Sequence, residues 1–129
     1  GHDIGKLKID LWLENLNVID LDNYKLKIFH TPGHTSGCIC IYEPFHKFIF
    51  TGDTVFAGGV ISYIAPSGSW GDYVNSIERL CSMRIEEIYP AHGWISKSGE
   101  EDLFRAGEEA KSRMDQYLES LRQKKNVTI

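Results

Sequence analysis

The chain has 129 residues, a length that fits a single domain, and its 42% hydrophobic and 25% charged residues are typical of a folded globular protein. Its formal net charge is −4 without a block of basic residues, which gives no electrostatic reason to expect nucleic acid as a partner. No apolar stretch approaches the length of a membrane span, and three cysteines (Cys38, Cys40 and Cys81) do not suit a disulfide framework. We therefore expect a cytoplasmic protein that does not bind membranes.

The N-terminal third of the sequence predicts strands. Residues 7–20 alternate loosely between apolar and polar positions, which predicts either one or two short strands or an irregular lead-in, and the Asp and Asn residues of 20–23 favour a turn. Residues 24–30 alternate cleanly and predict a strand with one solvated face. One face of this strand would carry Tyr24, Leu26 and Ile28, and the other face would carry Lys25 and Lys27.

Two further strands and a long loop follow. The apolar runs at 38–42 and 47–51 predict buried strands, and residues 43–46 predict the hairpin connection between them. Residues 52–71 contain several glycines and predict a loop. Long loops within compact domains are often functional.

The C-terminal half predicts two helices separated by a strand. Ser69 or Asp72 would cap the first helix, whose apolar residues recur at spacings of three and four. Residues 85–89 predict the strand, which a proline ends. A serine-to-glutamate capping box, Ser98 to Glu101, opens the second helix. The apolar stripe of this second helix consists of Leu103, Ala106, Ala110, Met114, Tyr117 and Leu121.

Three potential metal ligands, His34, Asp53 and His92, each come shortly after the end of a predicted strand. Two antiparallel steps separate the first of these strands from the second, and a crossover helix makes the third strand parallel to the second. All three strands would then end at the same edge of the sheet, where ligand sites are generally found. The order of the elements therefore predicts that the three side chains converge.

The chemistry of these donors suits a metal site. Imidazole and carboxylate groups are ordinary ligands of zinc, iron and manganese. A glycine next to each donor permits close backbone approach, and Thr35 and Thr54 could orient the ligands through hydrogen bonds. Taken singly, each donor also has a structural interpretation, as a loop histidine bonded to the backbone or as a turn residue.

Other residues near these donors favour structural roles. Cys38 and Cys40 are expected to be buried as small apolar side chains. Trp70, Tyr73 and Trp94 could line a substrate pocket, although aromatic residues more often fill a core.

Three motifs in this order resemble the C-terminal part of the metallo-β-lactamase-fold superfamily, which includes glyoxalase II. They are Thr31-Pro-Gly-His-Thr35, Thr51-Gly-Asp-Thr54 and Tyr89-Pro-Ala-His-Gly93. The resemblance covers roughly residues 7–122 and implies an α/β fold, layered as α+β. This would be the C-terminal half of an αββα sandwich, with a mixed sheet and helices on one face, forming a single partial domain over residues 1–129. It also implies two metal ions, with His34 on the first, Asp53 bridging the pair and His92 on the second.

The His-x-His-x-Asp-His segment that supplies most other ligands in this superfamily has no counterpart in the sequence. The chain therefore resembles a fragment of a larger hydrolase. The parent is expected to hold two divalent ions, with zinc favoured over iron or manganese. A catalytic zinc ion normally takes three protein ligands, so we expect this chain alone to bind metal weakly or not at all. No catalytic residue other than the metal ligands is assigned.

The activity implied for the parent is hydrolysis of an ester, thioester or amide in a small-molecule substrate by metal-activated hydroxide. We expect the isolated chain to be inactive. Two alternatives stay open: an iron-dependent oxidoreductase of the same fold, similar to a persulfide dioxygenase, and a non-catalytic interaction module. Half a sandwich would also expose an apolar sheet face, so we expect a dimer or larger homo-oligomer that covers this face.

Overall fold

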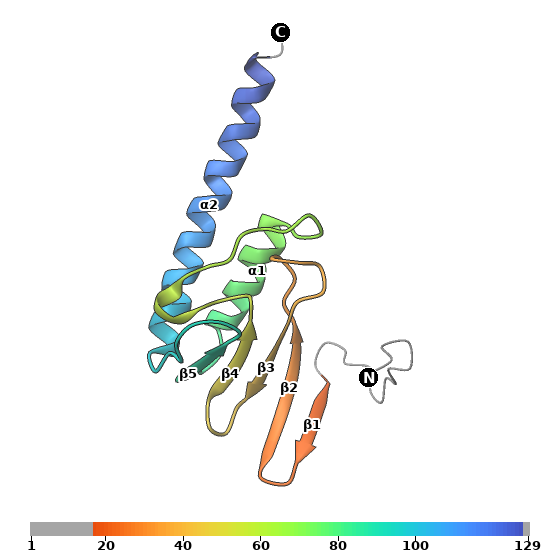
Figure 1. Ribbon diagram of the computed structural model, residues 1–129, viewed down its shortest axis with the longest axis vertical. Coiled ribbons are helices and arrows are strands. Elements are labelled where there is room, and N and C mark those ends of the chain that lie inside the picture. Colours follow the sequence, from red (N-terminus) through yellow and green to blue (C-terminus); the bar gives the residue numbers. More distant parts are fainter. Residues whose placement is uncertain (1–16, 128–129) are drawn as a thin grey trace, which may run out of the picture.

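The computed structural model describes residues 17–127, which form a five-stranded mixed sheet with two helices packed on one face (Figure 1). The strands follow each other across the sheet in chain order. Neighbours are antiparallel from β1 to β4, and β5 lies parallel to β4. The strands are β1 (Val18–Leu21), β2 (Tyr24–His30), β3 (Ile39–Glu43), β4 (Phe48–Gly52) and β5 (Glu87–Pro90). The α+β class and the mixed sheet with helices on one face, which the resemblance implied, are confirmed.

The strand predictions hold to within two residues at each end. The strand predicted at 24–30 is β2, and β3 and β4 are each displaced by one residue from the predicted runs. β5 begins two residues later than predicted because Ile85 and Glu86 complete the connection from the preceding helix. Of the strands predicted within residues 7–20, β1 is observed, and residues 7–16 lie outside the described part of the chain.

The first helix, α1 (Trp70–Cys81), begins at the earlier of the two predicted caps. The Ser69 hydroxyl accepts a hydrogen bond from the Asp72 N–H at 3.2 Å, which satisfies one of the amide groups left unpaired at a helix start. Before α1, the long loop from β4 contains a single turn of 3₁₀-helix, η2 (Ala57–Gly59). The predicted loop at 52–71 is therefore mostly irregular.

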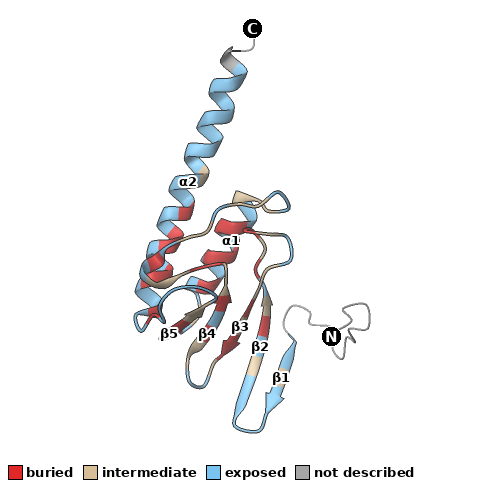
Figure 2. Cartoon of the chain, viewed as in Figure 1, coloured by how far each residue is buried: buried red, intermediate tan, exposed pale blue. Residues whose placement is uncertain are grey.

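The second helix, α2 (Gly99–Val127), has 29 residues, which corresponds to a length of about 44 Å. Its first half packs on the body of the protein and its second half projects beyond the sheet (Figure 1). The predicted apolar stripe is buried at Leu103, Ala106 and Ala110, whereas Tyr117 and Leu121 are 48% and 40% exposed (Figure 2). The second half of the apolar stripe is therefore not buried, because the helix is longer than the layer on which it packs.

The core lies between the helices and one face of the sheet. Its strand residues include Cys40, Tyr42, Ile49 and Ile88, which meet the buried faces of α1 and α2. Burying such side chains contributes about 1.5–3 kcal/mol each relative to leaving them in water, so this layer supplies most of the stability of the fold. The helical residues of this core include Tyr73, Val74, Ile77, Leu80, Leu103, Ala106 and Ala110.

The sheet face that the helices do not cover is also apolar. Cross-strand partners lie on the same face of a sheet, and Ile28 pairs with Ile41, which in turn pairs with Phe50. The ring of Phe50 lies 5.6 Å from that of Phe48 and 5.3 Å from that of Tyr89. Association of copies through this face stays a prediction.

This arrangement corrects the expected orientation of β2. The register pairs Lys27 with Tyr42 and Phe29 with Cys40, so the lysine face of β2 is the face on which the helices pack. Lys27 is nevertheless exposed. The reason is that the helices cover β3 to β5, whereas the outer part of β2 extends beyond them (Figure 1).

Within residues 17–127, none of the helices has both the length and the apolar character that crossing a lipid bilayer requires.

One glycine allows α1 to approach the segment after β2 very closely. A Cβ atom built on Gly33 would lie 2.4 Å from the Tyr73 Cα atom, closer than two carbon atoms can pack. The Ser76 hydroxyl donates to the Pro32 carbonyl at 2.7 Å, and the Ser69 N–H donates to the Gly33 carbonyl at 2.9 Å. The start of α1 therefore holds the backbone of residues 32 and 33 from three neighbouring positions.

We predict that Gly33→Ala lowers the free energy of unfolding by about 1–3 kcal/mol, the usual cost of overpacking, because the new methyl group meets main-chain atoms that cannot move independently. Urea denaturation measures the change. Gly37→Ala is the matched control, since a Cβ atom at Gly37 would meet nothing within 4 Å. Equal stability of the two variants would contradict the close approach.

Candidate metal centre

The carboxyl ends of β2, β4 and β5 lie at one edge of the sheet, and the loops after them bring the three predicted donors together. His34, Asp53 and His92 line a single pocket of about 390 Å³. The remaining lining residues are Phe56, Ile61, Ser62 and Tyr63, which come from the loop between β4 and α1. The structure thus brings the three side chains to one place, while their role as metal ligands stays a prediction.

His34 is buried, and its ring orientation is defined by the loop that crosses it. The ring nitrogen Nδ1 lies 2.6 Å from the Tyr63 carbonyl oxygen, and the Tyr63 ring packs edge-on against the imidazole with centroids 4.9 Å apart. A carbonyl oxygen can only accept a hydrogen bond, so Nδ1 carries the proton. Nε2 then keeps the lone pair, which is the arrangement of a histidine prepared to bind a metal.

The same contact decides against a serine–histidine catalytic pair. The Ser62 hydroxyl lies 3.1 Å from His34 Nδ1, a distance at which a histidine can activate a serine. Since Nδ1 already donates its hydrogen to Tyr63, it has no lone pair with which to take the serine proton. Ser62 therefore contacts the imidazole but is not activated as a nucleophile.

Asp53 and His92 meet each other at the open side of the pocket. Asp53 Oδ1 lies 3.5 Å from His92 Nε2, and the two side chains are 43% and 79% exposed. An exposed ion pair contributes little to stability. Two ligands at about 2.1 Å from a tetrahedral zinc ion lie about 3.4 Å apart, so this pair has the spacing of two ligands of one ion.

The three donors would supply part of the ligand set of a metal centre. Within residues 17–127, no group of three or more His, Cys, Asp or Glu side chains is close enough to hold an ion. Asp53 and His92 would share one ion, and His34 would offer Nε2 from the inner wall of the pocket. The donor types and the distance between Asp53 and His92 therefore fit a metal ion. The donors are too few, however, to fill all the protein ligand positions of a catalytic ion.

The strand ends and turns that present the donors have local causes. β4 and β5 change register between Phe50 and Gly52, and the Ala91 N–H donates to the Gly52 carbonyl at 2.9 Å. A pair of backbone hydrogen bonds between Ile88 and Ser96 closes the turn that carries His92. The positive φ of Gly52 (54°), one residue before Asp53, favours glycine at this position.

A buried carboxylate that the sequence analysis missed joins these turns to α2. Asp102 Oδ2 accepts hydrogen bonds from the Gly58 N–H at 2.9 Å and from the Ser96 hydroxyl. Gly58 belongs to the loop after Asp53, and Ser96 closes the turn of His92. In sequence, Asp102 is one of three acidic residues that open α2, so nothing distinguished it from a solvated residue at a helix start.

Several expectations about the neighbours of the donors need correction. The Thr35 hydroxyl lies 3.0 Å from the Cys38 thiol and not against a donor. Trp70, Tyr73 and Trp94 do not line the pocket: Tyr73 belongs to the core and Trp94 is 84% exposed. The aromatic lining comes instead from Phe56 and Tyr63, which lie within the long loop where no periodic pattern marks them.

The cysteines offer no activated nucleophile. Cys40 is fully buried, as expected, and burial raises the pKa of its thiol to about 11, so it stays protonated at neutral pH. Burial also raises the pKa of Cys81. Cys38 is half-buried and lies outside the strand predicted to contain it.

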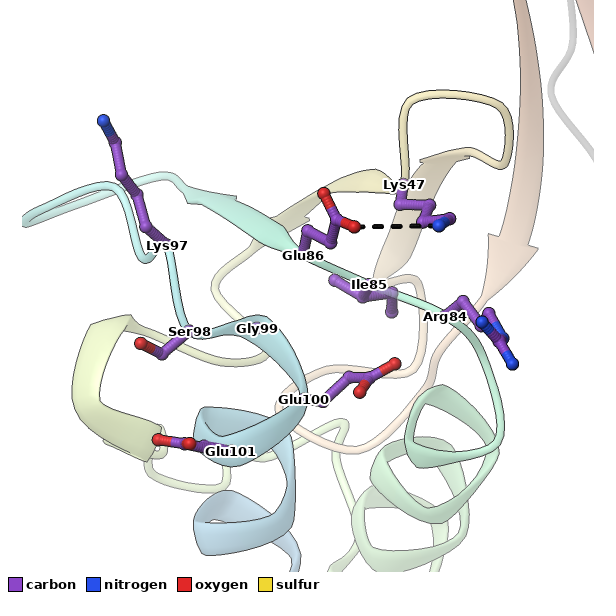
Figure 3. Close-up of a pocket in the computed structure, with 9 residues that line it drawn as sticks. All are labelled: Lys47, Arg84, Ile85, Glu86, Lys97, Ser98, Gly99, Glu100 and Glu101. Carbon is purple, nitrogen blue, oxygen red and sulfur yellow. Dashed lines mark ion pairs between the residues drawn. The ribbon is translucent and has the colours of Figure 1, made fainter.

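A second pocket lies at the opposite edge of the sheet, where β4 and β5 begin (Figure 3). It has a volume of about 360 Å³ and contains an ion pair of 3.7 Å between Lys47 and Glu86. Its charged residues balance, with Lys47, Arg84 and Lys97 against Glu86, Glu100 and Glu101. Balanced, exposed charges of this kind do not favour one class of ligand.

Replacing Asp102 tests whether it holds the two donor loops. We predict that Asp102→Ala lowers the free energy of unfolding by about 2 kcal/mol or more, because the buried Ser96 hydroxyl and the partly buried Gly58 N–H lose a charged acceptor. Thermal and urea unfolding measure the loss. Glu101→Ala is the matched control, since this exposed residue lies in the same helical turn. A similar loss in both variants would show that Asp102 stabilises the protein only through the helix dipole and not by binding the two donor loops.

Comparison with known proteins agrees with this geometry. A model of the metallo-beta-lactamase superfamily matches residues 4–92. Acyl-coenzyme A thioesterase MBLAC2 from Gallus gallus is 35% identical over 97 residues, which cover 72% of this chain and 34% of that protein. Hydroxyacylglutathione hydrolase from Maricaulis maris is 38% identical over 87 residues, which cover 65% of this chain and 32% of that protein. The chain thus spans about a third of the length of these curated relatives.

Two solved structures share the fold. The metallo-beta-lactamase family protein TTHA1429 from Thermus thermophilus superposes with a TM-score of 0.72 at 17% identity, over 84% of this chain and 37% of that one. TTHA1623 in a di-iron-bound form superposes with a TM-score of 0.57 at 31% identity, over 69% of this chain and 43% of that one. With the family model, the curated relatives and the fold in agreement, the chain belongs to the metallo-beta-lactamase superfamily.

Proposed function

We propose that this chain forms one side of the active site of a metal-dependent hydrolase that acts on a thioester, or on an ester or amide of similar shape. The observation that carries the proposal is the convergence of His34, Asp53 and His92 on a single pocket at the carboxyl edge of the sheet. A thioester is favoured because the relatives MBLAC2 and hydroxyacylglutathione hydrolase are named for cleaving acyl-coenzyme A and an acyl-glutathione. Since the chain spans a third of those relatives, the activity is proposed for the whole protein that carries it.

The metal, when bound, lowers the pKa of water and polarises the scissile carbonyl, which removes the need for a side-chain nucleophile. The protein supplies donors at defined positions. Asp53 and His92 present an oxygen and a nitrogen 3.5 Å apart, and the Tyr63 carbonyl holds His34 in the tautomer that leaves Nε2 available. Zinc is the metal proposed first, and iron and manganese are the alternatives, because imidazole and carboxylate groups are ligands of all three.

The rest of the pocket suits the apolar part of a substrate. Phe56, Ile61 and Tyr63 line the pocket together with the donors, and the Phe56 ring centroid lies 6.5 Å from that of His92. An acyl chain packed on these side chains would place its carbonyl beside the donors. Orientation by such contacts is a large part of what an enzyme of this kind contributes.

We predict that His34→Ala and Asp53→Asn, each made in the natural protein at its full encoded length, lower kcat/KM for a thioester substrate by more than about 100-fold. Loss of a residue that only supports a metal ligand costs about 10–100-fold, so loss of a ligand should exceed that range. Turnover and metal content by elemental analysis are measured together. His46→Gln is the control, because this histidine lies in the β3–β4 hairpin beside Glu43 and not in the pocket.

Wild-type turnover in both variants would remove the hydrolase proposal. Protein that purifies with iron and consumes oxygen would select the oxidoreductase instead, and full-length protein that never binds metal would select the interaction module.

For the chain of residues 1–129 alone, we predict weak metal binding and no measurable turnover. Asp53 and His92 provide two donors where a catalytic zinc ion takes three from the protein. Elemental analysis after dialysis against buffer with low zinc measures the stoichiometry. Nearly one metal ion per chain would contradict this prediction.

A further inference from the structure

Tyr73 lies in the first turn of α1, fully buried, and its hydroxyl lies between two segments of the long loop from β4 to α1. The hydroxyl donates a hydrogen bond to the Thr54 carbonyl oxygen and accepts one from the Ser62 N–H at 2.9 Å. Thr54 follows Asp53 directly, and Ser62 precedes Tyr63, whose carbonyl holds the His34 ring. One oxygen atom therefore connects the backbone next to Asp53 with the segment whose Tyr63 carbonyl contacts the His34 ring.

The main chain of Tyr73 also contacts the segment that carries His34. The Cα atom of Tyr73 lies where a side chain of Gly33 would stand, so α1 packs directly against the backbone that precedes His34. The loop before α1 is tied to this segment as well, because the Ala65 N–H donates to the His34 carbonyl at 2.9 Å. His34 is thus held through its own backbone and through its ring, both by way of segments that contact Tyr73.

We propose that Tyr73 is a positioning residue, whose hydroxyl joins the Thr54 and Ser62 segments of the long loop and so holds the His34 imidazole in one tautomer and orientation. What the positioned groups do rests on the proposed function. The locking itself is a property of this chain's own hydrogen bonds and needs no metal.

The hydroxyl suits this role because it is a donor and an acceptor at the same time. Burial raises the pKa of Tyr73 to about 12, so the group keeps its hydrogen through the physiological range and can serve Thr54 and Ser62 together. A phenylalanine would keep the ring and its packing against Trp70, whose centroid lies 5.9 Å away, and would lose only the oxygen. The backbone N–H of Ser62 would then lack its partner.

Tyr73→Phe in the natural full-length protein tests the proposal. The first readout is the tautomer of His34 in metal-free protein with ¹⁵N-labelled histidine, observed through long-range proton–nitrogen correlations. We expect wild-type protein to show the Nδ1–H form alone and Tyr73→Phe to show a mixture of tautomers. The second readout is zinc affinity, which we expect to fall by about 10–100-fold, the usual effect of removing a group that orients a metal ligand.

Tyr42→Phe is the matched control. Tyr42 is also a buried tyrosine, and its hydroxyl donates to the Arg84 carbonyl at 2.7 Å, a residue that does not line the His34 pocket. We expect both variants to lower the melting temperature by similar amounts, and only Tyr73→Phe to change the His34 tautomer. An unchanged tautomer in Tyr73→Phe, or the same change in Tyr42→Phe, would overturn the proposal.

Two further results distinguish a failure of the Tyr73 proposal from a failure of the proposed hydrolase function. If wild-type protein binds no metal but Tyr73→Phe still releases His34, the positioning role stands and the hydrolase proposal fails. If Tyr73→Phe does not fold, hydrogen exchange of the Ser62 amide in wild-type protein decides instead. Slow exchange supports its bond to Tyr73, and the exchange rate of an open loop amide overturns it.

Discussion

Parallel pairing of β4 with β5 determines where the functional residues of this protein can lie. Ile49 pairs with Ile88 in the middle of the two strands, so the strands end together and deliver Asp53 and His92 to the same edge. The two-step antiparallel path from β2 to β4 brings His34 to that edge as well. A shift in either pairing by one residue would turn the side chains to the other face and separate the donors.

The strands bring the donors near each other, and buried polar side chains of the helices hold the loops in place. Asp102 of α2 binds the turn after Asp53 and the turn of His92, and Tyr73 of α1 joins two segments of the loop between β4 and α1. Backbone groups in such loops would otherwise depend on water. Using helix side chains as their partners fixes the donors relative to the hydrophobic core, which is the most rigid part of the molecule.

Both faces of the sheet are apolar, although the helices cover only one of them. Membership of the metallo-beta-lactamase superfamily accounts for this pattern, since the resemblance implies a sandwich in which the sheet is buried on both sides. The rings of Phe48, Phe50 and Tyr89 form the contact surface that such packing would use. The same reasoning explains why the described donors cover only some of the positions around a metal ion.

The sequence by itself determined the strands, the two helices, the superfamily and the convergence of His34, Asp53 and His92, because hydrophobic periodicity and strand direction depend on the order of residues along the chain. Only the tertiary structure decided which groups surround those donors. Tyr73 lies 39 positions from His34, and Asp102 lies 49 from Asp53, since 73 − 34 = 39 and 102 − 53 = 49. Nothing in a local pattern distinguishes a buried tyrosine that binds two segments of a loop from one that fills a core, because packing determines which hydrogen-bond partners distant in sequence meet.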